Sequence, residues 1–303
     1  MARAQVTQQA GIPAPSSIQI WMMAARPKTL PAGIAPVLVG TALAGFLHVF
    51  HPLRFVAALL GSILIQIGAN LSNDYSDAHR GADTEDRLGP VRVTAGGLVP
   101  PRQVLIATYV TFGLAVLCGV YLIAVAGWQL LLIGVASIAA GVLYTGGPRP
   151  YGYLGLGEVF VFVFFGLVAT AGSAYVQHGR LGALAVAASV PVGLLSVSLL
   201  ESNNLRDVAG DAAAGKRTLA VRVGVSAARW LYVGAVLASF ATVGLVAWWR
   251  PFALLALAAL VLAWRPCRVV VKGAQGRDLL PVLAATGRLQ LVVGILLTLG
   301  IAL

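Results

Sequence analysis

Long apolar runs, separated by short polar connections, cover almost the whole chain after residue 28. Several runs reach the roughly 20 residues with which an α-helix crosses a bilayer, and lipid leaves no water to hydrogen-bond an open backbone. The pattern therefore predicts an all-α integral membrane protein, a nine-helix transmembrane bundle. The expected helices lie at about residues 29–47, 53–72, 104–125, 128–145, 157–176, 181–200, 229–249, 251–264 and 287–303.

The composition supports this prediction, because 59% of the residues are hydrophobic and only 10% are charged, which excludes a water-soluble domain. The net charge of +11 does not indicate nucleic acid, since the arginines stand singly between apolar runs and no basic block alternates with aromatic residues. Two cysteines provide no disulfide framework. Residues 1–20 lack a signal-peptide pattern, so we expect a cytoplasmic lead at 1–20 and a single transmembrane domain at 21–303.

The distribution of basic residues predicts the orientation in the membrane. If nine helices alternate, three long polar connections, at about residues 73–103, 201–228 and 265–286, fall on the side of the N-terminus. That side then carries 18 of the 21 lysines and arginines, and the other side carries only Arg54, Arg180 and Arg250. Because positively charged loops stay in the cytosol, we expect the N-terminus and the long loops to be cytoplasmic. The expected location is the cell membrane, with the C-terminus outside.

Eight of the ten acidic residues lie on that same side, directly after the second and the sixth predicted helices. Within each set, carboxylates and amides recur at steps of three or four residues, so they share one face if the helix continues. The first set is Asn70, Asp74 and Asp77, and the second is Asn203, Asp207 and Asp211. Each of the two helices is thus predicted to end in a ladder of oxygen ligands.

Carboxylates stacked on one helix face repel each other unless a cation lies between them. Oxygen ligands without His or Cys favour Mg²⁺, which typically uses one or two carboxylates, waters and substrate phosphates. We therefore expect a site for magnesium and a diphosphate. The alternative is a pair of solvated loops whose aspartates cap helices or balance arginines. Two matching loops on one face favour the metal site.

Basic residues beside the two acidic sets are candidates for the diphosphate oxygens that the metal leaves free. Arg92 follows the first set, and Lys216 and Arg217 follow the second. Lys216 is the preferred residue, because the segment GKRT comes one helical turn after the second set. The alternative is that some of these charges only fix the topology.

These segments resemble the UbiA superfamily of intramembrane aromatic prenyltransferases, over nearly the whole chain from Arg26 onwards. Residues 73–77 (NDYSD) resemble the first aspartate motif of the superfamily, and residues 207–215 (DVAGDAAAG) resemble the second. The segments ARPKTLPAGIAPVLVGTAL, LYTGGPRPYGYLGLGE and NNLRDVAGDAAAGKRT are most similar to the branch that acts on 1,4-dihydroxy-2-naphthoate. Many relatives carry a third aspartate at the position of Gly81. The next acid here, Asp83, is a further candidate metal ligand.

The resemblance implies transfer of a polyprenyl group from an allylic polyprenyl diphosphate to 1,4-dihydroxy-2-naphthoate, with loss of diphosphate and CO₂, giving demethylmenaquinol. It also implies that Mg²⁺ is held by Asp74, Asp77, Asp207 and Asp211, with Lys216 as a catalytic cation. Asn70, Asn73 and Asn203 would then be neutral oxygen donors or supports. An allylic cation needs a dry chamber, which a helical bundle in lipid supplies.

Other residues are candidates for contact with the substrates. Arg26 and Lys28 are candidates for the naphthoate carboxylate or the diphosphate, and the alternative is that they anchor the chain at the cytoplasmic surface. Glu158 begins an otherwise uncharged helix, where a deeply buried acid costs about 2.5–3.5 kcal/mol, so it is a candidate proton acceptor or arginine partner. Aromatic candidates, which either face the cation or anchor at the interface, are Tyr144, Tyr151, Tyr153 and Phe160.

Alternatives remain inside and outside the superfamily. A related enzyme transfers a phytyl group to the naphthoate or uses 4-hydroxybenzoate as the acceptor. A different class is the secondary transporter, but its acids usually lie near the bilayer midplane rather than at helix ends in polar loops. The sequence indicates neither the prenyl chain length nor an oligomeric state.

Overall fold

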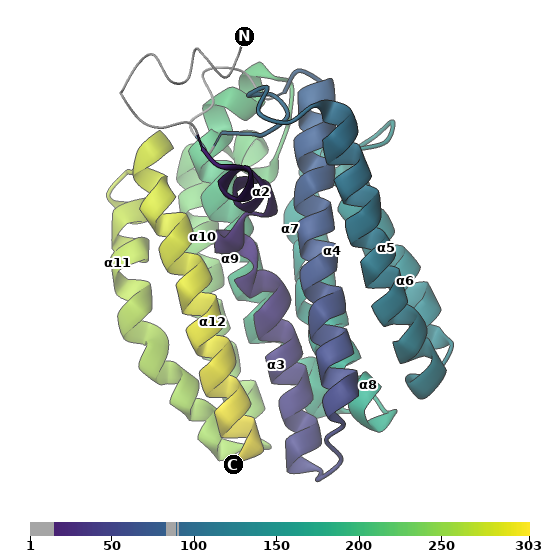
Figure 1. Cartoon of the computed structure of the whole chain (residues 1–303). Coiled ribbons are helices and arrows are strands. Elements are labelled where there is room, and N and C mark those ends of the chain that lie inside the picture. Colours follow the sequence, from purple (N-terminus) through teal and green to yellow (C-terminus); the bar gives the residue numbers. More distant parts are fainter. Residues whose placement is uncertain (1–14, 83–88, 90) are drawn as a thin grey trace.

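The chain is all helical over residues 15–82, 89 and 91–303, which are the residues that the structure, a computed structural model, describes. Figure 1 shows the long helices side by side with similar axis directions, and these residue ranges contain no strand. The elements are α2 (Ser17–Ala25), η1 (Pro27–Thr29), α3 (Pro31–Phe46), α4 (Pro52–His79), α5 (Pro101–Ala126), α6 (Gln129–Leu143), η2 (Tyr151–Leu154), α7 (Gly157–Val161), η3 (Phe162–Val168), α8 (Ala169–His178), α9 (Ala183–Ala213), α10 (Leu219–Ala247), η4 (Pro251–Ala259), α11 (Leu260–Val271), η5 (Gly276–Leu279) and α12 (Leu280–Ala302).

The number of membrane-crossing helices differs from the prediction. Among the described residues, seven helices are long and apolar enough to cross a membrane, and the bent pair Ser17–Thr29 and Pro31–Phe46 makes up to eight. The predicted helix at 128–145 corresponds to α6, whose 15 residues are few for a full crossing. The fold is therefore that of a multi-pass membrane protein, and the count of nine transmembrane helices is not confirmed.

Two helices continue beyond their apolar runs into the acidic segments. α4 runs for 28 residues to His79, and α9 runs for 31 residues to Ala213. Glycines in the left-handed conformation follow both helices, Gly81 with φ 68° and Gly215 with φ 73°, and this conformation ends a helix. The acidic ladders thus belong to the last turns of two long helices, as their spacing predicts.

Small residues allow the helices to approach each other closely. A Cβ on Gly166 in η3 would lie 2.7 Å from the Cα of Gly193 in α9, so neither position has room for a side chain. Gly40 in α3 likewise has no room for a Cβ against the carbonyl of Thr170 in α8. These contacts confirm that glycine serves helix packing here, in the way that is usual in membranes.

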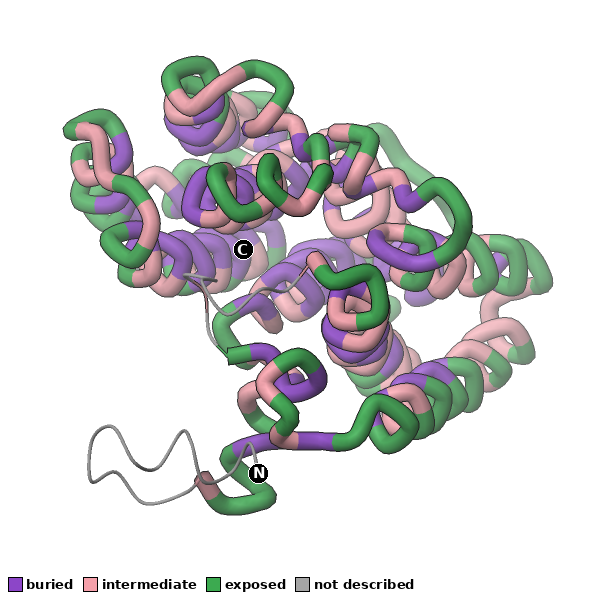
Figure 2. Tube along the Cα trace, turned by 90° about the horizontal axis from the view of Figure 1, so that it is seen from above, coloured by how far each residue is buried: buried purple, intermediate pink, exposed green. Residues whose placement is uncertain are grey.

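The outer surface of the bundle carries large apolar side chains. Leu117, Val261 and Trp264 are 66%, 75% and 69% exposed. Figure 2, which looks along the bundle, shows that exposed residues lie mainly on the outward sides of the helices and buried residues on the inward sides. An apolar exterior around a partly polar interior suits a protein that is surrounded by lipid.

Candidate active site

A chamber of about 780 Å³ lies between the helices and begins where α4 and α9 carry their aspartates. Its wall is polar at this end, which we call the mouth, and mainly apolar further along α4, α5, α6 and α8. The residues of α4 that line it run from Asp77 to Ala58, which are about 28 Å apart along the helix. A deep apolar cavity with a few polar groups at one end is typical of a ligand site.

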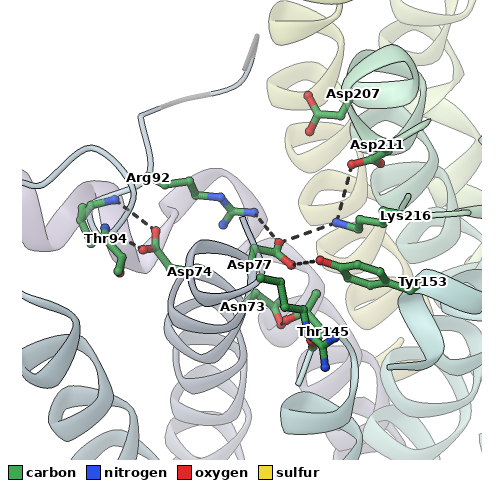
Figure 3. A network of polar contacts seen from close by, with 12 residues as sticks. Asn73, Asp74, Asp77, Arg92, Thr94, Thr145, Tyr153, Asp207, Asp211 and Lys216 are labelled. Carbon is green, nitrogen blue, oxygen red and sulfur yellow. Dashed lines mark hydrogen bonds and ion pairs between the residues drawn. The ribbon is translucent and has the colours of Figure 1, made fainter. Parts of the chain in front are cut away.

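Asp74 is buried at the mouth, with 1% of its surface exposed, and it fixes the loop between α4 and α5. Its Oδ1 accepts the backbone N–H of Thr94 at 2.9 Å, and its Oδ2 accepts that of Val93 at 3.2 Å. These bonds, shown in Figure 3, hold the neighbouring Arg92 against the chamber.

Asp77 is the centre of the polar network in Figure 3. Its Oδ2 lies 3.5 Å from Nη2 of Arg92 and 3.7 Å from Nζ of Lys216. Its Oδ1 accepts a hydrogen bond from the hydroxyl of Tyr153 at 3.0 Å. Lys216 Nζ also lies 3.8 Å from Oδ1 of Asp211 in α9. One lysine therefore joins the two aspartate motifs across the mouth.

A buried arginine directly before the second motif, Arg206, is not among the predicted site residues. Arg206 donates from Nε and Nη2 to the two carboxylate oxygens of Asp207, at 2.8 and 2.6 Å. The arginine side chain is 3% exposed and the aspartate 14% exposed. Asn203, one turn earlier on α9, lines the same side of the chamber. All these groups lie near the C-terminal end of α9.

The break between α2 and α3 is held by the first motif. Arg26 has φ 54°, a left-handed conformation that is unusual for a side chain other than glycine. Asn70 in α4 donates from Nδ2 to the carbonyl of Ala25 at 2.9 Å and to the hydroxyl of Thr29 at 3.1 Å. These bonds fix the segment in which Arg26 and Lys28 line the chamber.

Aromatic rings form one wall just below the mouth. Tyr151 stacks on Phe160 with 3.9 Å between ring centroids, Tyr144 meets Tyr151 edge to face at 5.4 Å, and Phe164 lies 6.1 Å from Phe160. Burial raises the pKa of Tyr144 well above its ordinary value, and the charge of Glu158 adds to the effect. Burial also raises the pKa of Tyr151. Both tyrosines are therefore neutral phenols at physiological pH.

Glu158 lies behind the chamber wall rather than on it. Its Oε1 accepts a hydrogen bond from Nδ2 of Asn204 at 2.7 Å, and Asn204 lines the chamber. The carboxylate is 7% exposed and stands in the first turn of α7, where the helix dipole favours a negative charge. Glu158 therefore orients an amide that faces the chamber.

Most of the predicted site residues come together at one chamber. Arg217 is the exception on α9 and its loop, since it is exposed and does not line the wall, and Asp83 lies outside the described residues. Asn204 and Arg206 line the chamber but were not among the predicted site residues. In the sequence, only their positions next to Asn203 and Asp207 indicate a place in the site. The predicted residues that line the chamber are Arg26, Lys28, Asn70, Asn73, Asp74, Asp77, Arg92, Tyr144, Tyr151, Phe160, Asn203, Asp207, Asp211 and Lys216. The candidate Tyr153 does not line the chamber but is bonded to Asp77.

The donor set at the mouth fits a divalent cation in its chemistry. It consists of carboxylate and amide oxygens, and Asn73, whose Oδ1 accepts the Thr145 hydroxyl at 2.9 Å, adds one of the neutral ones. Within the described ranges, no three His, Cys, Asp or Glu side chains are close enough together to share a metal. Cationic side chains lie there instead, Lys216 between the two motifs and Arg206 on Asp207.

Comparison with known proteins places these observations in a family. Residues 33–278 match the model of the UbiA prenyltransferase family. The chain is 43% identical over 277 residues to the 1,4-dihydroxy-2-naphthoate octaprenyltransferase of Mycobacterium tuberculosis (strain ATCC 25618 / H37Rv), covering 91% of this chain and 94% of the relative. It is 39% identical over 300 residues to the enzyme of the same name from Escherichia coli (strain K12), covering 95% and 96%.

The fold is similar to that of a solved UbiA homologue from Archaeoglobus fulgidus, bound to DMAPP and Mg²⁺. The TM-score is 0.65 at 13% sequence identity, and the match covers 92% of this chain and 98% of the homologue. The family match and the extensive sequence identity confirm the superfamily resemblance, and the solved structure shows the same fold. The chain belongs to the UbiA prenyltransferase family.

Proposed function

We propose that the protein transfers a polyprenyl group from an allylic polyprenyl diphosphate to 1,4-dihydroxy-2-naphthoate, releasing diphosphate and CO₂ and giving demethylmenaquinol. The observation that carries this proposal is the junction at the mouth, where Lys216 links two aspartate motifs directly above a deep apolar chamber. A diphosphate with an apolar tail matches both parts. The naphthoate octaprenyltransferases among the relatives support the choice of acceptor.

We infer that Mg²⁺ is held by oxygens of Asp74, Asp77, Asp207 and Asp211, with Asn73 and Asn203 in support. When bound, the metal neutralises charge that develops on the departing diphosphate. The structure of the A. fulgidus homologue with DMAPP and Mg²⁺ supports a metal in the family.

The protein's own cations complete the diphosphate site. Lys216 and Arg92 both approach Asp77 within 4 Å, so they are already placed beside the first motif. When a diphosphate enters, the two cations pair with its oxygens instead of with Asp77. The oxygens of Asp77 are then available to the metal. The bond between the allylic carbon and the diphosphate oxygen then breaks, and its electron pair leaves with the diphosphate.

The wall below the mouth protects the allylic carbon after this bond breaks. The stacked rings of Tyr151 and Phe160 present π-faces that attract a cation. The apolar wall beneath them excludes water, which would otherwise capture the cation. Tyr144 stays protonated and so adds no nucleophilic phenolate at this point.

The acceptor then attacks through the ring carbon that bears its carboxylate. The new carbon–carbon bond uses ring electrons, and departure of CO₂ returns an electron pair to the ring, so this step requires no proton acceptor. Arg26 and Lys28, both at the mouth, are the cations that hold the carboxylate before it leaves. Asn204, oriented by Glu158, offers an amide to a ring hydroxyl.

The orientation that fits these substrates has the mouth on the cytoplasmic side. We infer this from the positive loops, and we infer that α6, which packs against α4 and α5, completes a set of nine crossings. Water-soluble naphthoate would then enter from the cytosol, and the prenyl donor from the lipid.

Purified protein in lipid nanodiscs with Mg²⁺, a prenyl diphosphate and naphthoate labelled at its carboxyl carbon tests the proposal. We expect diphosphate and labelled CO₂ in equal amounts, loss of turnover with a chelator, and 4-hydroxybenzoate used at least about 100-fold less efficiently. Product that retains the label, or a preference for 4-hydroxybenzoate, would contradict the acceptor. If phytyl diphosphate is used more efficiently than the polyprenyl diphosphates, the proposed donor is wrong and the acceptor is unaffected. Without any diphosphate release, the prenyltransferase proposal fails and transport becomes the leading function.

A further inference from the structure

Beyond the mouth, the chamber has a far end that no part of the proposed chemistry uses. Its polar side chains there are serines whose hydroxyls are taken up by backbone carbonyls: Ser62 by Gly33, and Ser137 by Ile133. Ser173 is likewise bonded to Ala169. The far end therefore offers an occupant almost no free hydrogen-bonding group, and only an apolar chain suits it.

Three glycines from three helices line this far end, and they are Gly119 in α5, Gly134 in α6 and Gly172 in α8. A Cβ built on any of them meets no heavy atom within 4 Å, so each faces open space. Other chamber glycines differ: a Cβ on Gly61 or Gly141 would already contact a neighbour. A side chain at any of these three positions would therefore project into open space at the far end.

The three glycines lie at a similar depth, which can be read along α4. Gly61 of α4 lies against Cys118 of α5, so Gly119 lies near the level of Gly61. Gly141 of α6 lies against Ala69 of α4, and Gly134 lies two helical turns further from the mouth on α6. Gln177 in α8 accepts a hydrogen bond from the backbone N–H of His51, just before α4 begins, and Gly172 lies five residues before Gln177. These levels fall at residues 56–62 of α4, about 22–32 Å of helix below Asp77.

We propose that Gly119, Gly134 and Gly172 form the length gauge of the protein, the part of the wall that determines how long a prenyl tail the donor can carry. This rests on the proposed function, since it requires a diphosphate at the mouth. A tail that starts at the mouth and runs along α4 reaches the three glycines only when it is long, and a side chain there blocks long tails alone. Donors too short to reach this depth are indifferent to the change.

The experiment measures kcat/KM for geranyl, farnesyl, geranylgeranyl and octaprenyl diphosphate with the naphthoate acceptor. The variants are Ala and Leu at each glycine. Relative to the wild type, the Leu variants should keep geranyl transfer within about twofold and lose at least about tenfold with the longest donor, and the Ala variants should lose less. The matched control is Gly113→Leu on α5, at an exposed position that also faces open space but does not line the chamber.

The outcomes separate the length gauge from the function beneath it. If wild-type protein shows no transfer from any donor, the proposed function fails rather than the gauge. With transfer established, an unchanged ratio of long to short donors in all three Leu variants overturns the gauge. Equal losses for short and long donors in both the Ala and Leu variants also overturn it, because they indicate general damage. A shifted ratio in Gly113→Leu would do the same.

Discussion

Lys216 contacts a carboxylate from each aspartate motif, Asp77 from α4 and Asp211 from α9. Its ammonium also lies 5.5 Å from the ring centroid of Tyr153, whose hydroxyl is bonded to Asp77. One ammonium thus lies between the two facing carboxylates, and Arg92 is a second cation beside Asp77. Sequence reasoning selected this lysine from its distance to the second motif, but the contact with the first motif depends on the packing of two distant helices.

We expect Lys216→Met to lower turnover at least about 100-fold and to raise the KM of the prenyl diphosphate, because it removes a cation from the site where charge develops. The matched control is Arg149→Gln, an exposed positive residue outside the chamber wall, which should change turnover by less than about threefold. Steady-state kinetics in nanodiscs, with donor concentration varied, measures both. Near-normal kinetics in Lys216→Met would remove this lysine from the diphosphate site.

A double substitution can separate the proposed metal-ligand role of Asp207 from its ion pair with Arg206. Asp207→Ala should abolish turnover by removing a metal ligand, and it should also lower the melting temperature, since Arg206 stays buried without its bidentate partner. The double variant Arg206→Met with Asp207→Ala should recover most of the melting temperature and none of the turnover. Fluorescence-detected thermal unfolding and a product assay give the two readouts. Recovery of activity in the double variant would show that Asp207 is not a ligand.

At the scale of the elements, the two acidic ladders were predictable and their surroundings were not. The four-residue spacing of Asp207 and Asp211 predicts one helical face, and α9 indeed continues through both. By contrast, nothing in the sequence around Asp74 predicts that its two oxygens bind the backbone of Val93 and Thr94. Such bonds depend on how a loop folds back, which apolar periodicity does not describe.

The break between α2 and α3 depends on Asn70, and we expect its removal to affect binding more than chemistry. Asn70→Ala removes the bonds to the carbonyl of Ala25 and to the hydroxyl of Thr29, so the segment around the left-handed Arg26 keeps only part of its support, from Gln66 and Thr29. The KM of the naphthoate should rise about tenfold or more, with a smaller change in kcat. Steady-state kinetics with acceptor varied tests this. Thr111→Ala, whose hydroxyl bonds only its own helix α5, is the control and should leave both constants near normal.

At the scale of the whole molecule, hydropathy predicted every long helix of the described residues, because lipid imposes its rule on each segment alone. It could not predict that α6 has only 15 helical residues or that α2 and α3 meet at 51°. Hydropathy also could not predict the depth of the chamber, because that depends on how α5, α6 and α8 pack and on the glycines that they place along its wall. Local rules set the elements, and contacts between distant elements set the site.

The predicted orientation can be tested with single cysteines in a background without Cys118 and Cys267. Ala95→Cys, exposed near the mouth, should react with a membrane-impermeant thiol reagent only after the cytoplasmic side is opened. Arg180→Cys, exposed after α8 at the opposite end, should react in intact cells. Labelling of both positions from the same side would contradict the opposite placement of the two ends, and the reverse pattern would invert the orientation.

All four aspartates of the two motifs stand near the C-terminal ends of α4 and α9, where the helix dipole is itself negative. Lys216, Arg92 and Arg206 offset part of this concentration of negative charge, and a divalent cation that binds there offsets more of it. Ligand binding and folding stability are therefore linked.

We expect Mg²⁺ together with inorganic diphosphate, at about 100 times their dissociation constant, to stabilise the protein by about 2.7 kcal/mol. A thermal unfolding assay detects this without any turnover, and an Asp77→Asn variant should show a smaller shift. A melting temperature that does not respond would mean that neither ligand binds the folded site, whatever the kinetics suggest.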